Sequence, residues 1–177
     1  MNIRVEGRAR ILGDNVNTDY IIASRRKRET LDGALLRQYL LEAVDPSFAA
    51  SVRPSDILVA GTNFGCGSAM EIAVTVVQAA GIAAVLARSF ARAYFRNAVN
   101  NGLLAIECET HDIREGDRLV IEADTGTWIH NLTTGNASKG ATLPAHIVAV
   151  LSEGGLVPYF RRHRRFGAGW AEAEAGG

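Results

Sequence analysis

Three glycines within seven residues follow a short apolar run, and this loop constrains the fold more than any other stretch. Ile57–Ala60 is apolar, of strand length, and bounded by Asp56 and Gly61; Gly65 and Gly67 come next. Glycine accepts positive φ angles and lets other groups approach the backbone closely. The sequence therefore predicts a strand that ends in a tight loop, which other parts of the chain contact.

A helix over 69–80 is predicted to follow this loop, although the run is rich in β-branched residues. Its polar residues Glu71, Thr75 and Gln78 recur at helical spacing and form one thin stripe. Ser68 and Glu71 match the S-x-x-E capping box, with Ser68 as N-cap. Ser68 is then either an ordinary cap or part of a site where backbone N–H groups stabilise an anion or an alkoxide.

Nucleotide-binding motifs do not fit the glycine loop. A dinucleotide fingerprint set on Gly65 and Gly67 needs a third glycine where the chain has Met70. A phosphate-binding P-loop needs a lysine that the loop does not contain. Nucleotide binding is therefore disfavoured.

The overall composition argues against nucleic-acid, membrane and metal-binding classes. The formal net charge is zero, and no apolar run is long enough to span a bilayer. The opening residues alternate like a strand and have no signal-peptide core, so we expect a cytoplasmic protein. The two cysteines, Cys66 and Cys108, form no C-x-x-C motif, and the four histidines are scattered. We expect no metal or cofactor to be bound by this chain alone.

The order of predicted elements indicates a mixed α/β fold. Further strands are predicted over 3–12, 83–87, 103–107, 118–123 and 128–132, and further helices over 31–43, 90–101 and 145–152. Ser89 is expected to cap the helix over 90–101, and Gly102 to end it. The central β-α-β-α-β order predicts parallel strands with right-handed crossovers. We expect a single domain over 1–166 and a flexible tail over 167–177.

Two basic runs have several possible uses. Residues 25–28 read Arg-Arg-Lys-Arg, and residues 161–165 read Arg-Arg-His-Arg-Arg. Such runs are usually solvated surface, but they can also bind RNA or grip carboxylates through arginine forks. Without neighbouring aromatic residues, the run at 25–28 is a weak indication of nucleic-acid binding.

Four segments together resemble the small subunit of 3-isopropylmalate dehydratase, in the aconitase superfamily. They are GDNVNTDYI (13–21), GTNFGCGS (61–68), ARSFARAYFRNAVNNGL (87–103) and GGLVPY (154–159). The resemblance implies the swivelling β/β/α domain, in which additional strands join the β-α-β-α-β core to form a barrel-like sheet. It also implies a hydro-lyase of leucine biosynthesis, active only as a heterodimer or heterotetramer with a large subunit that carries a [4Fe–4S] cluster.

The resemblance also assigns roles to individual residues. Ser68 matches the serine that takes a proton next to a substrate carboxylate, and Asp19 matches a supporting catalytic aspartate. Arg28 falls where a substrate-facing loop carries an arginine. Gly65 and Gly67 of the loop, together with position 70, are expected to bind the hydroxy-acid substrate.

The chain departs from the family pattern directly after Ser68. The family continues Ser-Arg-Glu-His, whereas this chain has Ala69, Met70, Glu71 and Ile72. The missing arginine normally binds a substrate carboxylate. Either an arginine of the run at 25–28 replaces it, or the substrate presents an apolar group to Met70. A non-catalytic paralogue, a paralogue specialised for another hydroxy acid, and a small-anion or RNA-binding module are the alternatives.

Overall fold

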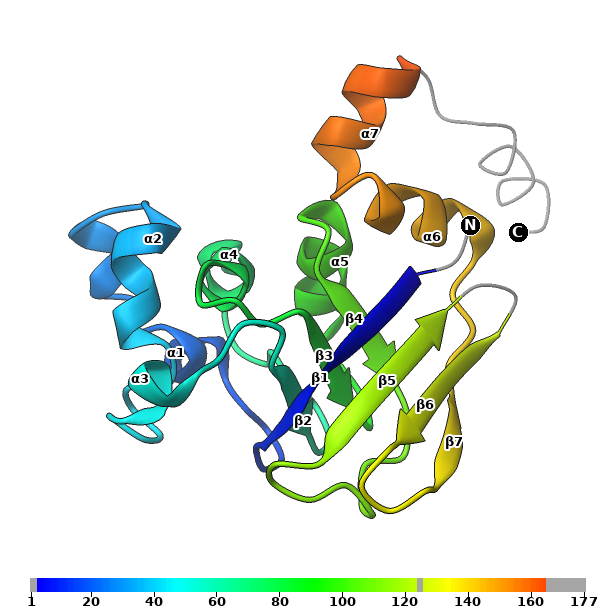
Figure 1. Cartoon of the computed structure of the whole chain (residues 1–177). Helices are drawn as coiled ribbons and strands as arrows, with labels where there is room; N and C mark the ends of the chain where they lie inside the picture. The colour runs from blue at the N-terminus through cyan, green and yellow to red at the C-terminus, as the bar shows by residue number, and fades with distance from the viewer. Residues whose placement is uncertain (1–2, 124–125, 165–177) are drawn as a thin grey trace.

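A seven-stranded sheet forms the scaffold of the molecule (Figure 1). The computed structural model describes residues 3–123 and 126–164, so the predicted tail and Arg165 lie outside the described residues. The strand order is β4-β3-β2-β1-β5-β6-β7. The strands are β1 (Ile3–Ile11), β2 (Ile57–Ala60), β3 (Ala84–Ala87), β4 (Leu104–Glu107), β5 (Arg118–Ala123), β6 (Thr127–Asn131) and β7 (Ala137–Gly140).

The sheet has a parallel and an antiparallel half that meet at β1. Strands β2, β3 and β4 run parallel, as the β-α-β-α-β order predicts, and β1 also pairs parallel with β2. Strands β5, β6 and β7 pair antiparallel. The outer edges of the two halves approach each other, because Cys108 forms a bridge with Gly140 and the Ala141 N–H donates to the Glu107 carbonyl at 2.7 Å. The result is a nearly closed, barrel-like sheet, which confirms the predicted fold class.

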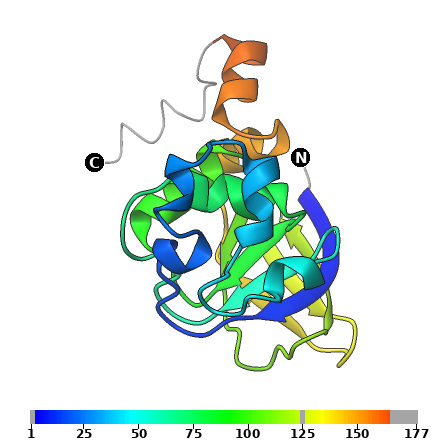
Figure 2. The ribbon, with the colours of Figure 1, turned by 90° about the vertical axis from the view of Figure 1, so that its left-hand side faces the viewer.

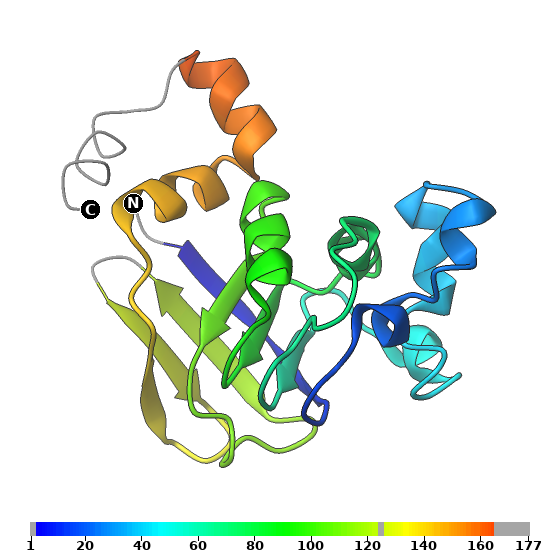
Figure 3. The ribbon, with the colours of Figure 1, turned by 180° about the vertical axis from the view of Figure 1, so that it is seen from behind.

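Helices cover one face of the parallel half, and two further helices lie at one end of the sheet. Figures 1 and 2 show α1 to α5 on the same side of the parallel strands, and Figure 3 shows β5 to β7 on the far side from α1 to α4. The α-helices are α1 (Thr18–Ile21), α2 (Gly33–Leu36), α3 (Phe48–Ser51), α4 (Ile72–Ala79), α5 (Arg92–Asn100), α6 (Ala145–Ser152) and α7 (Leu156–His163); η1 (Arg26–Arg28) and η2 (Arg37–Tyr39) are 3-10 turns. None of the helices in the described part is long and apolar enough to cross a membrane.

The alternation of side chains along β2 separates two hydrophobic cores. Leu58 and Ala60 belong to the core under the helices, with residues of α4 and α5. Ile57 and Val59 point the other way, into the barrel interior. Because successive side chains of a strand point to opposite faces, a strand that is buried on both faces must be apolar throughout. The Ile57–Ala60 run is apolar for this reason.

Three helix predictions need correction. The predicted helix over 31–43 is broken into α2, η2 and turns, and Leu41 has a φ of 57°. Helix α4 starts at Ile72 with Glu71 as N-cap, so the assignment of Ser68 as N-cap is wrong. Helix α5 starts at Arg92 after Ala91, and the hydroxyl of Ser89 instead accepts the Asn63 N–H at 2.8 Å. The predicted end is confirmed, since Gly102 follows α5 with a φ of 76°.

Candidate active site

Backbone hydrogen bonds bring three of the four family-like segments together at the glycine loop. The Gly65 N–H donates to the Val16 carbonyl at 2.8 Å, and the Thr18 N–H donates to the Cys66 carbonyl at 2.8 Å. On the other side of the loop, the Ala91 N–H donates to the Phe64 carbonyl at 2.9 Å. The loop over 61–68 therefore lies between the segments 13–21 and 87–103.

Gly65 and Gly67 of this loop are required by both conformation and space. Gly65 has a φ of 78° and Gly67 a φ of 95°, a region that other residues enter at a cost. A β-carbon on Gly65 would overlap the Tyr94 ring, and one on Gly67 would lie 2.5 Å from Asn17 Oδ1. The glycines thus let the loop rest directly on Tyr94 and Asn17. A direct role of Gly65 and Gly67 in binding substrate stays a prediction.

Ser68 lies at the exposed end of the loop. Its carbonyl oxygen accepts the Thr18 hydroxyl at 2.9 Å and the Met70 N–H at 2.8 Å, while the residue itself is exposed. Helix α4 begins at Ile72, four residues after Ser68, with Glu71 as its N-cap. Ser68 is therefore in the loop before the helix and not at the helix start, where the sequence predicts it.

Asp19 is held beside Met70 by a serine that the sequence analysis did not single out. The Asp19 carboxylate accepts the Ser24 N–H at 3.1 Å and also the Ser24 hydroxyl. The Ser24 oxygen lies 3.9 Å from the sulfur of Met70. Met70 is only 7% exposed and packs into the core under the helices. Asp19 and Met70 are thus brought together, next to Thr18 and its contact with Ser68.

The arginines at 25–28 differ in how far their charges are satisfied. Arg26 donates two hydrogen bonds to Glu42 at 3.0 and 3.1 Å, and stacks 3.6 Å above the Tyr39 ring centroid. Arg25 contacts the same carboxylate at 3.3 Å. The hydrogen bond from Arg26 is the largest of the effects that lower the pKa of Glu42. Arg28 is exposed and makes no side-chain hydrogen bond or ion pair within residues 3–123 and 126–164.

Asp14 and Arg88 fix the start of the loop, which the sequence analysis missed. Arg88 donates to Asp14 Oδ1 at 2.6 Å, and the Thr62 N–H donates to the same oxygen at 2.7 Å. The Thr62 N–H bond is the largest effect that lowers the pKa of Asp14, and Arg88 adds to it. A β-carbon on Gly61 would overlap Asp14 Oδ1. No local pattern indicates this pairing, because the two residues are 74 positions apart.

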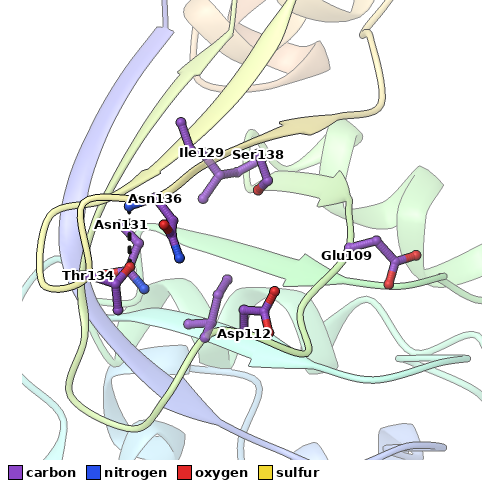
Figure 4. Close-up of a pocket in the computed structure, with 9 residues that line it drawn as sticks. Glu109, Asp112, Ile129, Asn131, Thr134, Asn136 and Ser138 are labelled. Carbon is purple, nitrogen blue, oxygen red and sulfur yellow. Dashed lines mark hydrogen bonds between the residues drawn. The ribbon is translucent and has the colours of Figure 1, made fainter.

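A separate hollow of about 240 Å³ lies between the β6–β7 hairpin and the segment after β4 (Figure 4). Asn131, one of its lining residues, donates from its side-chain amide to Asp117 at 2.7 Å. Its lining contains none of the six candidate site residues; it consists of Glu109, Asp112, Ile113, Ile129, Asn131, Thr134, Asn136, Ala137 and Ser138. The hollow is therefore not part of the candidate site.

The donor groups of the described residues do not fit an iron–sulfur cluster. In the part of the chain that the structure describes, no three His, Cys, Asp or Glu side chains are placed to hold a metal ion. Cys66 and Cys108 are both free thiols. Burial, with the nearby charge of Glu109, raises the pKa of Cys108 to about 12, so this thiol does not become a thiolate ligand readily.

Comparison with known proteins gives a consistent family. The family model "Aconitase C-terminal domain" matches residues 13–111, which is more than half of the chain. The isopropylmalate/citramalate isomerase small subunit of Methanocaldococcus jannaschii is 43% identical over 160 residues, covering 89% of this chain and 94% of that protein. The 3-isopropylmalate dehydratase small subunit of Nautilia profundicola is also 43% identical over 160 residues, covering 90% and 95%.

A solved structure agrees with these relatives. The crystal structure of 3-isopropylmalate dehydratase from Methanocaldococcus jannaschii matches with a TM-score of 0.83 and 35% identity, covering 98% of this chain and 100% of that one. The resemblance inferred from the four segments and the predicted fold class are thereby confirmed. The chain belongs to the aconitase C-terminal domain family, among the small subunits of 3-isopropylmalate dehydratase.

Proposed function

We propose that this chain is the small subunit of a [4Fe–4S]-dependent hydro-lyase and supplies the proton-abstracting base. The observation that carries the proposal is the position of Ser68, exposed at the end of a loop that Thr18 ties to the Asp19 segment. The relatives are named as small subunits, which supports a separate large subunit as partner. We propose a cytoplasmic enzyme, as the sequence analysis expected.

We propose that the cluster lies in the large subunit; this is supported by the described residues of this chain, among which no three His, Cys, Asp or Glu side chains are placed to hold a metal ion. When bound there, it supplies a Lewis acid that assists departure of the substrate hydroxyl. The residues of this chain act on the proton. The Ser68 oxygen takes a proton from the carbon next to a carboxylate, and returns a proton to the product when water is added back.

Asp19 and Arg28 have supporting roles in this proposal. The Asp19 carboxylate is oriented by the Ser24 N–H and hydroxyl, which fixes its position near the base. Glu42 pairs with Arg25 and Arg26, whereas Arg28 makes no ion pair in the described part of the chain. We propose that Arg28 receives a substrate carboxylate, in place of the family arginine that is Met70 here.

The presence of Met70 in place of the family arginine also bears on the class of substrate. The Met70 sulfur lies 3.9 Å from the Ser24 oxygen, and the residue is almost fully buried where the family pattern has a guanidinium. We propose an alkylmalate-type hydroxy acid whose apolar group approaches the small exposed part of Met70. Replacing Met70→Arg in the assembled enzyme should change the preference among 3-isopropylmalate, citramalate and other alkylmalates. An unchanged preference and turnover would mean that position 70 does not face the substrate.

Reconstitution tests the proposal as a whole. The chain is mixed with a cluster-loaded large subunit, and hydration and dehydration of the alkylmalates are measured for each subunit alone and for the mixture. We expect turnover only in the mixture. Equal turnover by the large subunit alone would contradict the proposal, and a folded, cluster-loaded mixture without activity would favour a non-catalytic paralogue.

A further inference from the structure

A hollow beside helix α5 combines exposed positive charge with aromatic side chains. It has a volume of about 510 Å³ and is lined by Phe90, Arg92, Phe95, Arg96 and Glu107, which we call the α5 patch. Arg92 and Arg96 are exposed, while Phe90 and Phe95 are half-buried. The two phenylalanine rings lie 6.0 Å apart. The patch therefore offers guanidinium groups beside an apolar floor.

The two arginines of the α5 patch are unsatisfied within the described chain. Neither Arg92 nor Arg96 makes a side-chain hydrogen bond or ion pair among residues 3–123 and 126–164, whereas Arg8, Arg26 and Arg88 do. The nearby Glu107 carboxylate accepts the Phe90 N–H at 3.2 Å instead. Like charges four residues apart on a helix repel each other, so this pair is a feature that the isolated helix does not favour.

The apolar part of the patch continues along α5. A second hollow of about 260 Å³ shares Phe95 and Arg96 with it, and is lined mainly by apolar side chains of α5, α6 and the start of α7. A ligand that filled both hollows would need carboxylates to pair with the arginines and an apolar side chain to fill the second hollow. Arginine and aromatic residues are also the types enriched at protein interfaces.

The α5 patch adjoins the loop that carries Ser68. Phe90 forms a parallel bridge with Phe64, and the adjacent Ala91 N–H donates to the Phe64 carbonyl at 2.9 Å. Phe64 is four residues before Ser68 in the same loop. A protein that covers Ser68 would therefore have the α5 patch next to its footprint.

We propose that the α5 patch is a docking surface for the large subunit, and that it receives an acidic segment with an apolar side chain from that subunit. This inference rests on the proposed function, because it needs a large subunit to exist. The carboxylates of the segment would pair with Arg92 and Arg96, and its apolar side chain would lie against Phe90 and Phe95. Such charge pairs speed association and fix the orientation of the partners.

Charge reversal tests the docking surface directly. Affinity of the full chain for the purified, cluster-loaded large subunit is measured for wild type and for Arg92→Glu/Arg96→Glu. A matched control, Arg37→Glu/Arg161→Glu, changes the total charge equally at two other exposed arginines. We expect Kd to rise at least about tenfold for the α5 variant and less than about threefold for the control. Thermal unfolding checks that all variants are folded.

A neutral variant and a salt series sharpen the result. Arg92→Gln/Arg96→Gln should weaken binding less than Arg92→Glu/Arg96→Glu does. It should also make binding less dependent on salt than it is for wild type, because fewer charges are paired. At saturating large subunit, turnover should stay near wild type, since the patch docks and does not react. Wild-type affinity of the reversed variant would overturn this inference alone, whereas no binding by the wild-type chain would overturn the proposed function as well.

Discussion

The hydroxyl of Thr18 donates a 2.9 Å hydrogen bond to the carbonyl oxygen of Ser68. This contact joins two segments fifty residues apart, and it holds the backbone of the proposed base at a fixed place beside Asp19. The Met70 N–H donates to the same carbonyl at 2.8 Å, so the oxygen keeps one partner if the Thr18 hydroxyl is removed. The effect of the Thr18 hydroxyl on the position of Ser68 can therefore be tested separately from its effect on the stability of the fold.

Replacing Thr18→Val should lower turnover more than it lowers stability. Thr18 is 1% exposed, and losing its hydrogen bond should cost about 1 kcal/mol of unfolding free energy. Loss of the tether should reduce kcat of the assembled enzyme by about tenfold or more, since small misplacements of reacting groups are costly. Thr110→Val is the control, because that hydroxyl also donates at 2.9 Å to a backbone carbonyl, that of Ala60. Equal kcat for both variants would contradict the positioning role.

Replacing Gly65→Ala should destabilise the chain far more than Gly135→Ala. Both glycines have a φ of 78°, so both variants carry the same backbone penalty of about 1–2 kcal/mol. A β-carbon at 65 would overlap Tyr94, whereas one at 135 would meet nothing within 4 Å. Overpacking should add about 1–3 kcal/mol at position 65, measured by chemical unfolding. Equal losses for the two variants would mean that the loop does not rest on Tyr94.

Replacing Tyr94→Phe should leave stability unchanged or raise it by up to about 1 kcal/mol. The Tyr94 hydroxyl is buried and has no hydrogen-bond partner among residues 3–123 and 126–164, and burial raises its pKa. A buried polar group without a partner carries an uncompensated desolvation cost, which phenylalanine avoids. Thermal unfolding at neutral pH checks this. A loss greater than about 1 kcal/mol would show that the hydroxyl has a partner, such as a buried water.

Acid should destabilise the fold partly through Asp56. Burial pushes the pKa of Asp56 upward, but hydrogen bonds from Arg8, the Arg53 N–H and Arg10, with the charge of Arg8, more than offset this, so its pKa lies below the usual value. Asp56 therefore stabilises the fold fully above its unfolded-state pKa of about 4, and loses this contribution as pH falls through the lower folded-state pKa.

Asp56→Asn tests this directly. It should cost about 3 kcal/mol at pH 7, because Arg8 and Arg10 lose their shared carboxylate. It should also flatten the fall in unfolding free energy below pH 4. Asp45→Asn, on the surface, is the control and should do neither to a comparable extent. If the unfolding free energy fell equally steeply below pH 4 for wild type and for Asp56→Asn, Asp56 would not contribute to the loss of stability in acid.

Local sequence patterns predicted several elements at their observed positions. Strand β2 begins and ends at the predicted residues, and α6 covers the predicted run after Pro144. Strand β7 was not predicted, because Ala137–Gly140 contains none of the residue types that favour strands. It is a strand because it pairs with β6 and closes the sheet at Cys108.

Long-range contacts explain what the sequence could not predict near the site. The predicted helix over 31–43 breaks where the Leu41 N–H donates to the Ile21 carbonyl at 2.9 Å. The capping box at Ser68 and Glu71 does not form, because the Ser68 carbonyl is engaged by Thr18 and the helix starts later. The pairing of Asp14 with Arg88 joins residues 74 positions apart, and no local pattern indicates it.

Turnover of Ser68→Ala in the complex with the large subunit tests the central claim most directly. Ser68 is exposed and its carbonyl contacts do not involve the side chain, so the variant should fold and assemble like wild type. If its hydroxyl is the base, kcat for the alkylmalate substrate should fall by about 10²–10⁴-fold, with KM changed much less. A folded, assembled Ser68→Ala enzyme whose kcat stays within about threefold of wild type would contradict the claim.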